Sequence, residues 1–271
     1  MKIIGSGGHV HCRYFDVYVM GFALVLLLGV VFGSFANVLI HRVPAGVSIS
    51  TPRSSCPNCG VQLAVKDNVP LISWILLRGK CRFCEVPISI RYPLVEIGLG
   101  TIFLFSALTI GFSAALPGIL VTDLVGLAAA AIDLESRRIP NRLTLWGGVG
   151  VAAAVVASSL LTGHVSLLYY SFIGGAIGFG FPFLIAVLSR GGMGMGDAKL
   201  SLVLGLSVGI LGPKYLFFFF LLTFGFGCLF GVGMMVARKL SRKDSLPFGP
   251  FLYAGFLSVQ LVWHLLASAR P

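Results

Sequence analysis

The chain has 271 residues, of which 57% are hydrophobic and only 11% are charged. An ordinary globular domain carries about 25% charged residues, and a soluble fold of this size exposes far more surface than so few charges cover. The composition therefore excludes a soluble enzyme, a disordered chain and a secreted disulfide scaffold, and it predicts an all-α polytopic membrane protein. The net charge of +11 is explained more simply by basic cytoplasmic loops than by nucleic-acid binding.

Eight apolar segments are predicted to cross the membrane as helices, a crossing that takes about 20 residues. In chain order they are Val17–Ile40, Pro93–Phe112, Ala114–Asp133, Leu143–Leu161, Ser166–Leu188, Ala198–Leu211, Tyr215–Ala237 and Pro250–Ala267. The sixth is the shortest of the eight. The first is too long for a cleavable signal peptide, and its end is too polar.

The basic residues predict the orientation of these spans. Loops 41–92, 134–142, 189–197 and 238–249, together with Lys199, hold 16 of the 20 lysines and arginines. The segments on the opposite side hold the other 4. Because basic residues collect in cytoplasmic loops, the first set is expected in the cytoplasm and both termini outside.

Three parts of the chain follow from this topology. They are 1–40, an outer N-terminus with the first transmembrane helix; 41–92, a cytoplasmic tetra-cysteine domain; and 93–271, a transmembrane helical core. The middle part is too short to build a robust hydrophobic core, and modules of this size usually need a covalent or metal staple.

Four cysteines in the 41–92 loop provide such a staple. Cys56 and Cys59 form one CxxC pair, and Cys81 and Cys84 form a second. Two such pairs are typical of a tetrahedral Cys₄ zinc site, which is closed to water and therefore structural. A redox dithiol pair and two disulfides are the alternatives, although disulfides are disfavoured on the cytoplasmic side of a membrane.

Acidic residues in or at the ends of spans need a reason, because a charge at the bilayer centre costs roughly 2.5–3.5 kcal/mol. Asp133 and Asp197 are both expected at cytoplasmic helix ends, and Asp197 follows a run of glycines. Asp197 as a helix N-cap and Asp133 as a boundary residue are the structural alternatives. Asp123 and Glu96 are interpreted as buried polar contacts, while Asp16, Asp67, Glu85, Glu135 and Asp244 are expected to be solvated.

Two carboxyl groups at one depth have a specific chemistry. When they are close together they share a proton, so that one activates water as a general base and the other polarises a peptide carbonyl as a general acid. Such a pair titrates as a unit, and neither role is assigned to one residue. This hypothesis predicts a membrane aspartic peptidase with Asp133 and Asp197 as the catalytic pair.

Several motifs, in this order, resemble those of the type IV prepilin peptidases, bifunctional leader peptidases and N-methyltransferases of type IV pilus and type II secretion systems. They are 33–38 (GSFANV), 41–44 (HRVP), the cysteine loop through 91–96 (RYPLVE), 132–135 (IDLE), 139–141 (IPN), 194–200 (GMGDAKL) and 248–251 (FGPF). In this likeness Asp133 opens the first catalytic region, and Asp197 completes the GxGD motif that holds the second aspartate. Asn141 departs from the family pattern, in which many members have Asp.

The resemblance implies a function for the whole chain. The implied substrate is a prepilin or pseudopilin with a short basic leader, cut at the cytoplasmic face of the bacterial inner membrane by a protease core at 93–271. The implied methyl donor is S-adenosylmethionine, acting on the new N-terminal residue. The methyltransferase residues are not identified by chemistry; loop 41–92 is the implied place, with Glu96 and Asp67 as polar candidates.

Two other classes of protein remain as alternatives. A proton-coupled transporter would use intramembrane acids as a relay, so that Asp123 and Glu96 would matter most. A membrane thiol-redox protein would need cysteines that are free of metal.

Overall fold

The computed structural model describes residues 7–189, 193–237 and 246–269, and in these ranges the long elements are all helices. They are α1 (Gly7–Arg42), α3 (Arg91–Ile110), α4 (Leu116–Ser136), α5 (Asn141–Thr162), α6 (Ser166–Leu188), α7 (Met195–Leu211), α8 (Tyr215–Val236) and α9 (Gly249–Ser268). A short 3₁₀ helix η1 (Val65–Asn68) and helix α2 (Ile72–Leu76) lie in the loop between α1 and α3. The all-α prediction is confirmed.

Seven of these helices are long and apolar enough to cross a membrane. The remaining predicted span, the sixth, corresponds to α7, which has 17 residues, the lower limit of the range of spanning helices. Helix α7 begins at Met195, three residues before the predicted start, and most of its residues are buried among its neighbours. It is therefore the central helix of the bundle, and its shortness does not expose polar backbone to lipid.

Glycines set the distance between α6 and α7. A Cβ placed on Gly174 would lie 2.2 Å from the carbonyl oxygen of Gly205, and one on Gly209 would lie 2.2 Å from the carbonyl oxygen of Tyr170. The two backbones are thus in direct contact, which is how small residues allow helices to associate in lipid. A hydrogen bond of 2.5 Å between the hydroxyls of Thr122 and Ser207 links α7 to α4.

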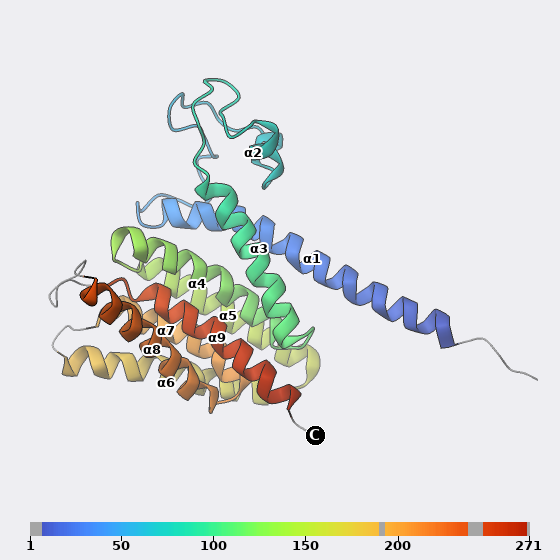
Figure 1. Cartoon of the computed structure of the whole chain (residues 1–271), viewed down its shortest axis with the longest axis vertical. Helices are drawn as coiled ribbons and strands as arrows, with labels where there is room; N and C mark the ends of the chain where they lie inside the picture. Colours follow the sequence, from blue (N-terminus) through green and yellow to red (C-terminus); the bar gives the residue numbers. More distant parts are fainter. Residues whose placement is uncertain (1–6, 190–192, 238–245, 270–271) are drawn as a thin grey trace, which may run out of the picture.

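The same device joins α1 to α3. A Cβ on Gly33 would lie 2.5 Å from the Cα of Glu96, and one on Gly29 would lie 2.8 Å from the Cα of Gly100. The N-terminal part of α1 continues beyond the rest of the bundle (Figure 1). The end of α1 that carries Asn37 is therefore the part held against α3 and α4.

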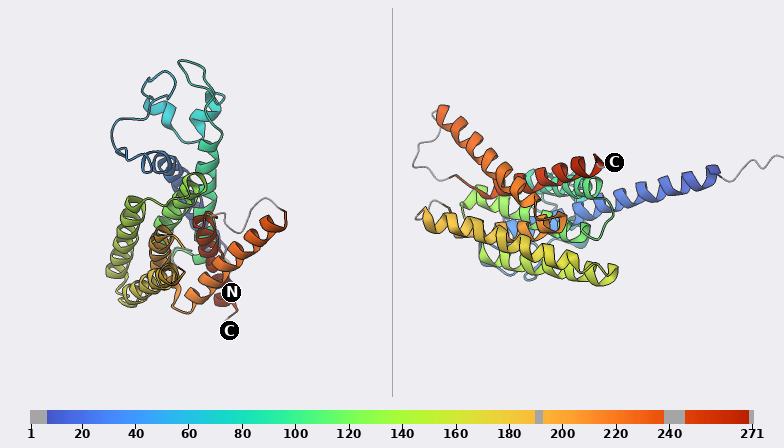
Figure 2. Two further views of the ribbon diagram at one scale, coloured as in Figure 1. Left: turned by 90° about the vertical axis from the view of Figure 1, so that its left-hand side faces the viewer. Right: turned by 90° about the horizontal axis from the view of Figure 1, so that it is seen from below.

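The cysteine loop extends from one end of the bundle, above the meeting point of α1 and α3 (Figure 1). Helix α8 diverges from the other helices, so that its C-terminal end lies apart from them (Figure 2). Each predicted cytoplasmic loop joins the end of one helix to the start of another: α1 to α3, α4 to α5, α6 to α7 and α8 to α9. The predicted cytoplasmic loops therefore share one end of the bundle; Arg190 and the basic residues of 238–245 lie outside the described residues.

Candidate active site and metal centre

Asp133 lies in the last turn of α4, where it is only 4% exposed. Its Oδ2 accepts a hydrogen bond of 2.8 Å from the backbone N–H of Gly249, the first residue of α9. A Cβ on Gly249 would lie 3.1 Å from both Cβ and Oδ2 of Asp133. The absence of a side chain at Gly249 therefore allows this backbone donor to reach the carboxylate.

Helix α4 ends one turn after Asp133. Arg137 adopts the left-handed conformation, with φ of 52°, and its N–H donates to the carbonyl oxygen of Asp133 at 2.9 Å. Pro140 then precedes α5 and excludes a continued helix. This local stop keeps Asp133 at the end of the bundle.

Asp197 lies in the first turn of α7 and is half-buried. It is not the N-cap, so that alternative is wrong in its detail: the helix begins two residues earlier, and Gly194 is the cap. The Asp197 Oδ2 instead accepts a bond of 3.2 Å from the N–H of Gly194. A carboxylate in this position also interacts favourably with the positive end of the helix dipole. Two glycines of the run that precedes Asp197, Gly191 and Gly192, lie outside the described residues.

The start of α7 packs against the connection between α4 and α5. A Cβ on Gly196 would lie 3.1 Å from the Cβ of Ile139. The Lys199 Nζ donates to the Asn141 Oδ1 at 2.8 Å, so Asn141, which departs from the family pattern, has a partner on the same helix as Asp197. The carboxylates of Asp133 and Asp197 are close enough to interact electrostatically.

Asp123 occupies a different environment, with no exposed surface. Its Oδ2 accepts a 2.6 Å bond from the Ser106 hydroxyl, and its backbone oxygen accepts a 3.1 Å bond from the Tyr253 hydroxyl. These bonds join α4 to α3 and α9. The interpretation of Asp123 as a buried contact between helices is confirmed.

The four loop cysteines come together as a cluster. Their Sγ atoms all lie within 4.8 Å of one another, and those of Cys56 and Cys84 are 3.7 Å apart. Four thiolates bound to zinc at about 2.3 Å in a tetrahedron would be separated by about 3.8 Å. All four cysteines are free. The geometry fits a single metal ion and favours it over two disulfides.

Both CxxC pairs sit in turns of the same design. The N–H of Cys56 donates to the carbonyl oxygen of Val61 and that of Cys81 to Val86, at 3.0 and 2.9 Å. The residue that follows each second cysteine has a positive φ, 70° at Gly60 and 55° at Glu85. This repeated backbone turns two sulfurs per pair toward one point.

Backbone amides also stabilise thiolates in the cluster. The pKa of the Cys84 thiol is lowered to about 6, first by the Val86 N–H and then by the Asn58 side chain. The N–H groups of Cys59 and Asn58 lower the pKa of Cys56. Because the thiolate is the form that binds metal, these donors favour metal binding at Cys56 and Cys84. Despite the Val61 N–H, burial and the neighbouring cysteines raise the pKa of the Cys59 thiol to about 11.

Asp67, expected to be solvated, is buried, and this expectation was wrong. Its carboxylate accepts three hydrogen bonds from Arg82, the shortest being 2.6 Å from Nη2 to Oδ1. The Arg82 guanidinium holds the pKa of Asp67 below its usual range. Since Arg82 lies between Cys81 and Cys84, this pair ties the cysteine cluster to η1.

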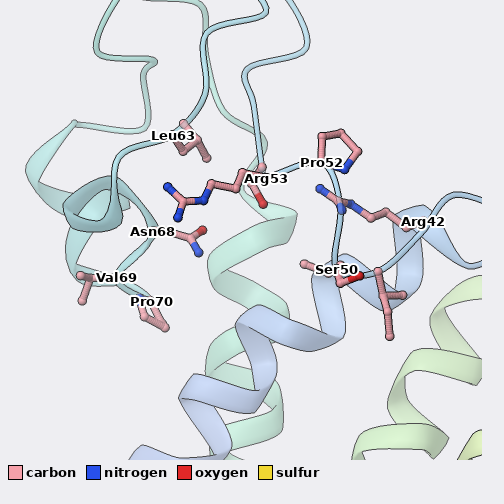
Figure 3. Close-up of a pocket in the computed structure, with 11 residues that line it drawn as sticks. Arg42, Ser50, Pro52, Arg53, Leu63, Asn68, Val69 and Pro70 are labelled. Carbon is pink, nitrogen blue, oxygen red and sulfur yellow. The ribbon is translucent and has the colours of Figure 1, made fainter.

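A cavity of about 570 Å³ separates the cysteine loop from the ends of α1 and α3, with Asn37, Asp67, Arg91 and Glu96 in its wall. Next to it is a hollow of about 480 Å³, lined by residues such as Arg42 and Arg53 and by no acid. In Figure 3 the Arg53 side chain extends between Leu63 and Asn68, while Arg42 lies beside Pro52.

Arg91, at the start of α3, connects the larger cavity to α4. Its guanidinium forms an ion pair with Glu135, which is two residues from Asp133. Glu135 is exposed, as predicted, but the ion pair was not predicted. Three residues of the family-like motifs had no predicted role: Gly249, Arg91 and Asn37. Only their tertiary contacts indicate one.

Comparisons with known proteins agree over most of the chain. Residues 27–110 match the family described as Bacterial Peptidase A24 N-terminal domain, and residues 119–232 match the Type IV leader peptidase family. Three similar proteins bear the name prepilin leader peptidase/N-methyltransferase. That of Bacillus subtilis is 32% identical (88% of this chain, 93% of the relative), that of Aeromonas hydrophila 33% (89% and 90%) and that of Burkholderia pseudomallei 34% (87% and 84%). No solved structure matches.

Proposed function

Because the chain belongs to the type IV leader peptidase family, we propose that it cleaves prepilin or pseudopilin precursors with Asp133 and Asp197 as its catalytic pair. It is an enzyme of the membrane: seven of its helices are long and apolar enough to span a bilayer. The observation that carries the proposal is that Asp133, in the last turn of α4, and Asp197, in the first turn of α7, lie close enough to interact electrostatically.

The chemistry follows from how each carboxylate is held. Within the described part of the chain, Asp133 and Asp197 each accept a backbone N–H through Oδ2, which leaves Oδ1 to act on water. One carboxylate takes a proton from the water as it attacks the scissile carbonyl carbon. The other, protonated, donates to the carbonyl oxygen. The tetrahedral intermediate then collapses: the C–N bond breaks as the proton taken from water passes to the leaving amine, and the hydroxyl proton returns to the second carboxylate as the C=O bond re-forms.

The position of the pair suits a substrate that is half in the membrane. A precursor with a short basic leader and an apolar helix would present the junction between them at the cytoplasmic interface. The helix ends that carry Asp133 and Asp197 are flanked by basic loops, which supports the same location in the inner membrane, with both termini on the outer side. In this division 93–271 is the protease core.

Two further components complete the proposed enzyme. The Cys₄ cluster would hold a structural zinc ion, which supplies no chemistry to the reaction and keeps loop 41–92 folded. The relatives' N-methyltransferase name supports a second activity, transfer of a methyl group from S-adenosylmethionine to the new N-terminal residue. The transporter and thiol-redox alternatives receive no support from Asp123, which serves as a helix contact, or from the comparisons.

The test is cleavage of a purified prepilin by the wild type and by Asp133→Asn and Asp197→Asn in detergent. Each variant should lose at least about a thousandfold in rate, because members of a catalytic set are not replaceable. Asp123→Asn is the matched control; it removes a buried carboxylate of the same bundle and should still cleave. Thermal unfolding and methylation of a pre-cut pilin establish that each protein is folded. Cleavage near the wild-type rate by either of the first two variants would refute the pair.

A further inference from the structure

The 570 Å³ cavity under the cysteine loop has the size of a small-molecule site, for which about 300–1,000 Å³ is typical. It lies between two parts of the chain that are far apart in sequence. One wall comes from α1 and α3, through residues such as Asn37, Tyr92 and Glu96, and the other from the metal-bearing loop, through residues such as Trp74 and Cys81.

Among the residues that the structure describes, two polar atoms of this wall have no hydrogen-bond partner. The Oδ1 of Asn37 is buried and accepts no hydrogen bond, although the residue is only 4% exposed. The Nη2 of Arg91 is likewise buried and donates none. Since buried polar atoms in native proteins are nearly always paired, these two residues of the cavity wall each keep an unused hydrogen-bonding atom, which a ligand with both functions would satisfy.

The third group is the Glu96 carboxylate, which is 7% exposed. Its Oε2 accepts a 2.8 Å bond from the N–H of Leu71, and the Ser34 hydroxyl is its other partner. Among the described residues it forms no ion pair. A buried carboxylate that faces a cavity without a cation of its own favours a positively charged ligand.

These three groups are held on adjacent turns. The Asn37 Nδ2 donates to the carbonyl oxygen of Tyr92 at 3.1 Å, next to Arg91 in the chain. Glu96 lies one turn further along α3 than Tyr92, at the point where Gly33 lets the two backbones touch. The close approach of α1 and α3 therefore brings the unpaired amide oxygen, the guanidinium and the carboxylate to one side of the cavity.

We propose that this cavity binds S-adenosylmethionine, with Arg91 Nη2 on the donor's carboxylate, Asn37 Oδ1 on its amino group and Glu96 beside its sulfonium. The proposal rests on the proposed methyl-transfer activity and gives it a place. The donor combines a carboxylate, an ammonium and a second positive charge in one small molecule, which matches the three groups of this wall. The neighbouring hollow, with Arg42 and Arg53 and no acid, lacks a group for that charge.

The reaction at this place balances without another reactant. The lone pair of the new N-terminal amine forms the N–C bond as the C–S bond breaks, and its electrons neutralise the sulfonium to a thioether. The methylated ammonium then loses a proton to water. The Arg91–Glu135 ion pair joins this cavity to the segment that carries Asp133, so the amine is produced next to the site that uses it.

The experiment measures binding of S-adenosylmethionine and of its thioether product, S-adenosylhomocysteine, to the full-length zinc-loaded protein in detergent. Glu96→Gln keeps an acceptor for the Leu71 N–H but removes the charge. It should weaken binding of the sulfonium about tenfold and change binding of the thioether less than about threefold. Asn37→Leu and Arg91→Gln should weaken both ligands about tenfold, because the thioether retains the amino-acid end.

A matched control separates this site from its surroundings. Arg53→Gln alters only the neighbouring hollow and should bind S-adenosylmethionine as the wild type does. Prepilin cleavage by each variant shows that the protein is folded and tests the proposed protease independently. Wild-type affinity in Glu96→Gln and Arg91→Gln would overturn the assignment of the cavity. A wild type that cleaves but neither binds nor uses the donor would overturn both the cavity and the methyl-transfer half of the proposed function.

Discussion

Gly249 offers the sharpest test of how Asp133 is positioned. In the structure the Gly249 N–H donates to Asp133 Oδ2 at 2.8 Å, and an added Cβ would lie 3.1 Å from two atoms of the same side chain. Ordinary contacts of a Cβ begin at 3.4 Å. Gly249→Ala must therefore displace the carboxylate or the start of α9 by a few tenths of an ångström while leaving both aspartates present.

The expected cost can be scaled from known positional effects. A misplacement of 1 Å can reduce a rate about a hundredfold, so a shift of a third to a half of that predicts a loss of about tenfold in kcat. The assay is steady-state cleavage of a prepilin in detergent, with KM measured separately. If Asp133 acts on the reacting atoms as proposed, kcat should fall and KM should change little.

Gly225→Ala is the matched control, since a Cβ at this position of α8 meets no atom within 4 Å. It should cleave like the wild type. If Gly249→Ala cleaves within about twofold of Gly225→Ala while the added methyl is accommodated, the argument that this amide positions a catalytic carboxylate fails.

Three other perturbations address the rest of the structure. Removal of metal by a chelator should make loop 41–92 sensitive to proteolysis and abolish methylation, but it should leave prepilin cleavage intact. The reason is that the cysteine cluster lines the large cavity and not the aspartate pair. Equal loss of both activities would contradict this. Asp67→Asn should destabilise the loop at neutral pH. Arg82 lowers the folded pKa of Asp67, so the carboxylate stabilises the loop above its unfolded pKa of about 3.9, and the difference from wild type should vanish as pH falls through the folded pKa. A difference that is constant with pH in denaturation of the loop would argue against the ion pair. Gly205→Ala places a Cβ 2.4 Å from the carbonyl oxygen of Gly174 and should lower stability by about 1–3 kcal/mol, whereas Gly180→Ala, in open space, should not change the Tm.

Much of the fold was predictable because the bilayer restricts it. Apolar length alone located the spans, and the observed helices differ from the predicted segments mainly at their ends. The start of α1 at Gly7 lies well before Val17 because the polar N-terminal residues continue the helix outside the apolar stretch. The start of α7 was predicted about one turn too late, at Asp197, because Gly194 and Met195 are poor signals of a helix start. Asp197 lies inside the first turn and accepts the N–H of the cap residue, Gly194.

Contacts between distant residues were not predictable in this way. Gly249 and Asp133 are 116 positions apart, and nothing in either local sequence says that α9 begins against the end of α4. Asp67 has the appearance of a solvated loop residue until the two cysteine turns bring Arg82 onto it. Neither local sequence indicates that Asn37 and Arg91, 54 positions apart, each have a buried atom without a hydrogen-bond partner among the described residues. Pairing of that kind depends on tertiary geometry, which hydropathy and spacing do not encode.

The acids of both proposed sites are stabilised in the same way, by a hydrogen bond from a backbone N–H. Lipid offers no water to stabilise a carboxylate, and the chain provides few cations inside the bundle. Asp133 and Asp197 therefore accept amides at Gly249 and Gly194, and Glu96 accepts the Leu71 amide where Gly33 lets two helices touch. A backbone donor satisfies a carboxylate without neutralising it, since no opposite charge is placed beside it. The negative charge thus remains available, to water at the aspartate pair and to a cation at Glu96, which is why glycine lies beside each acid that we assign to chemistry.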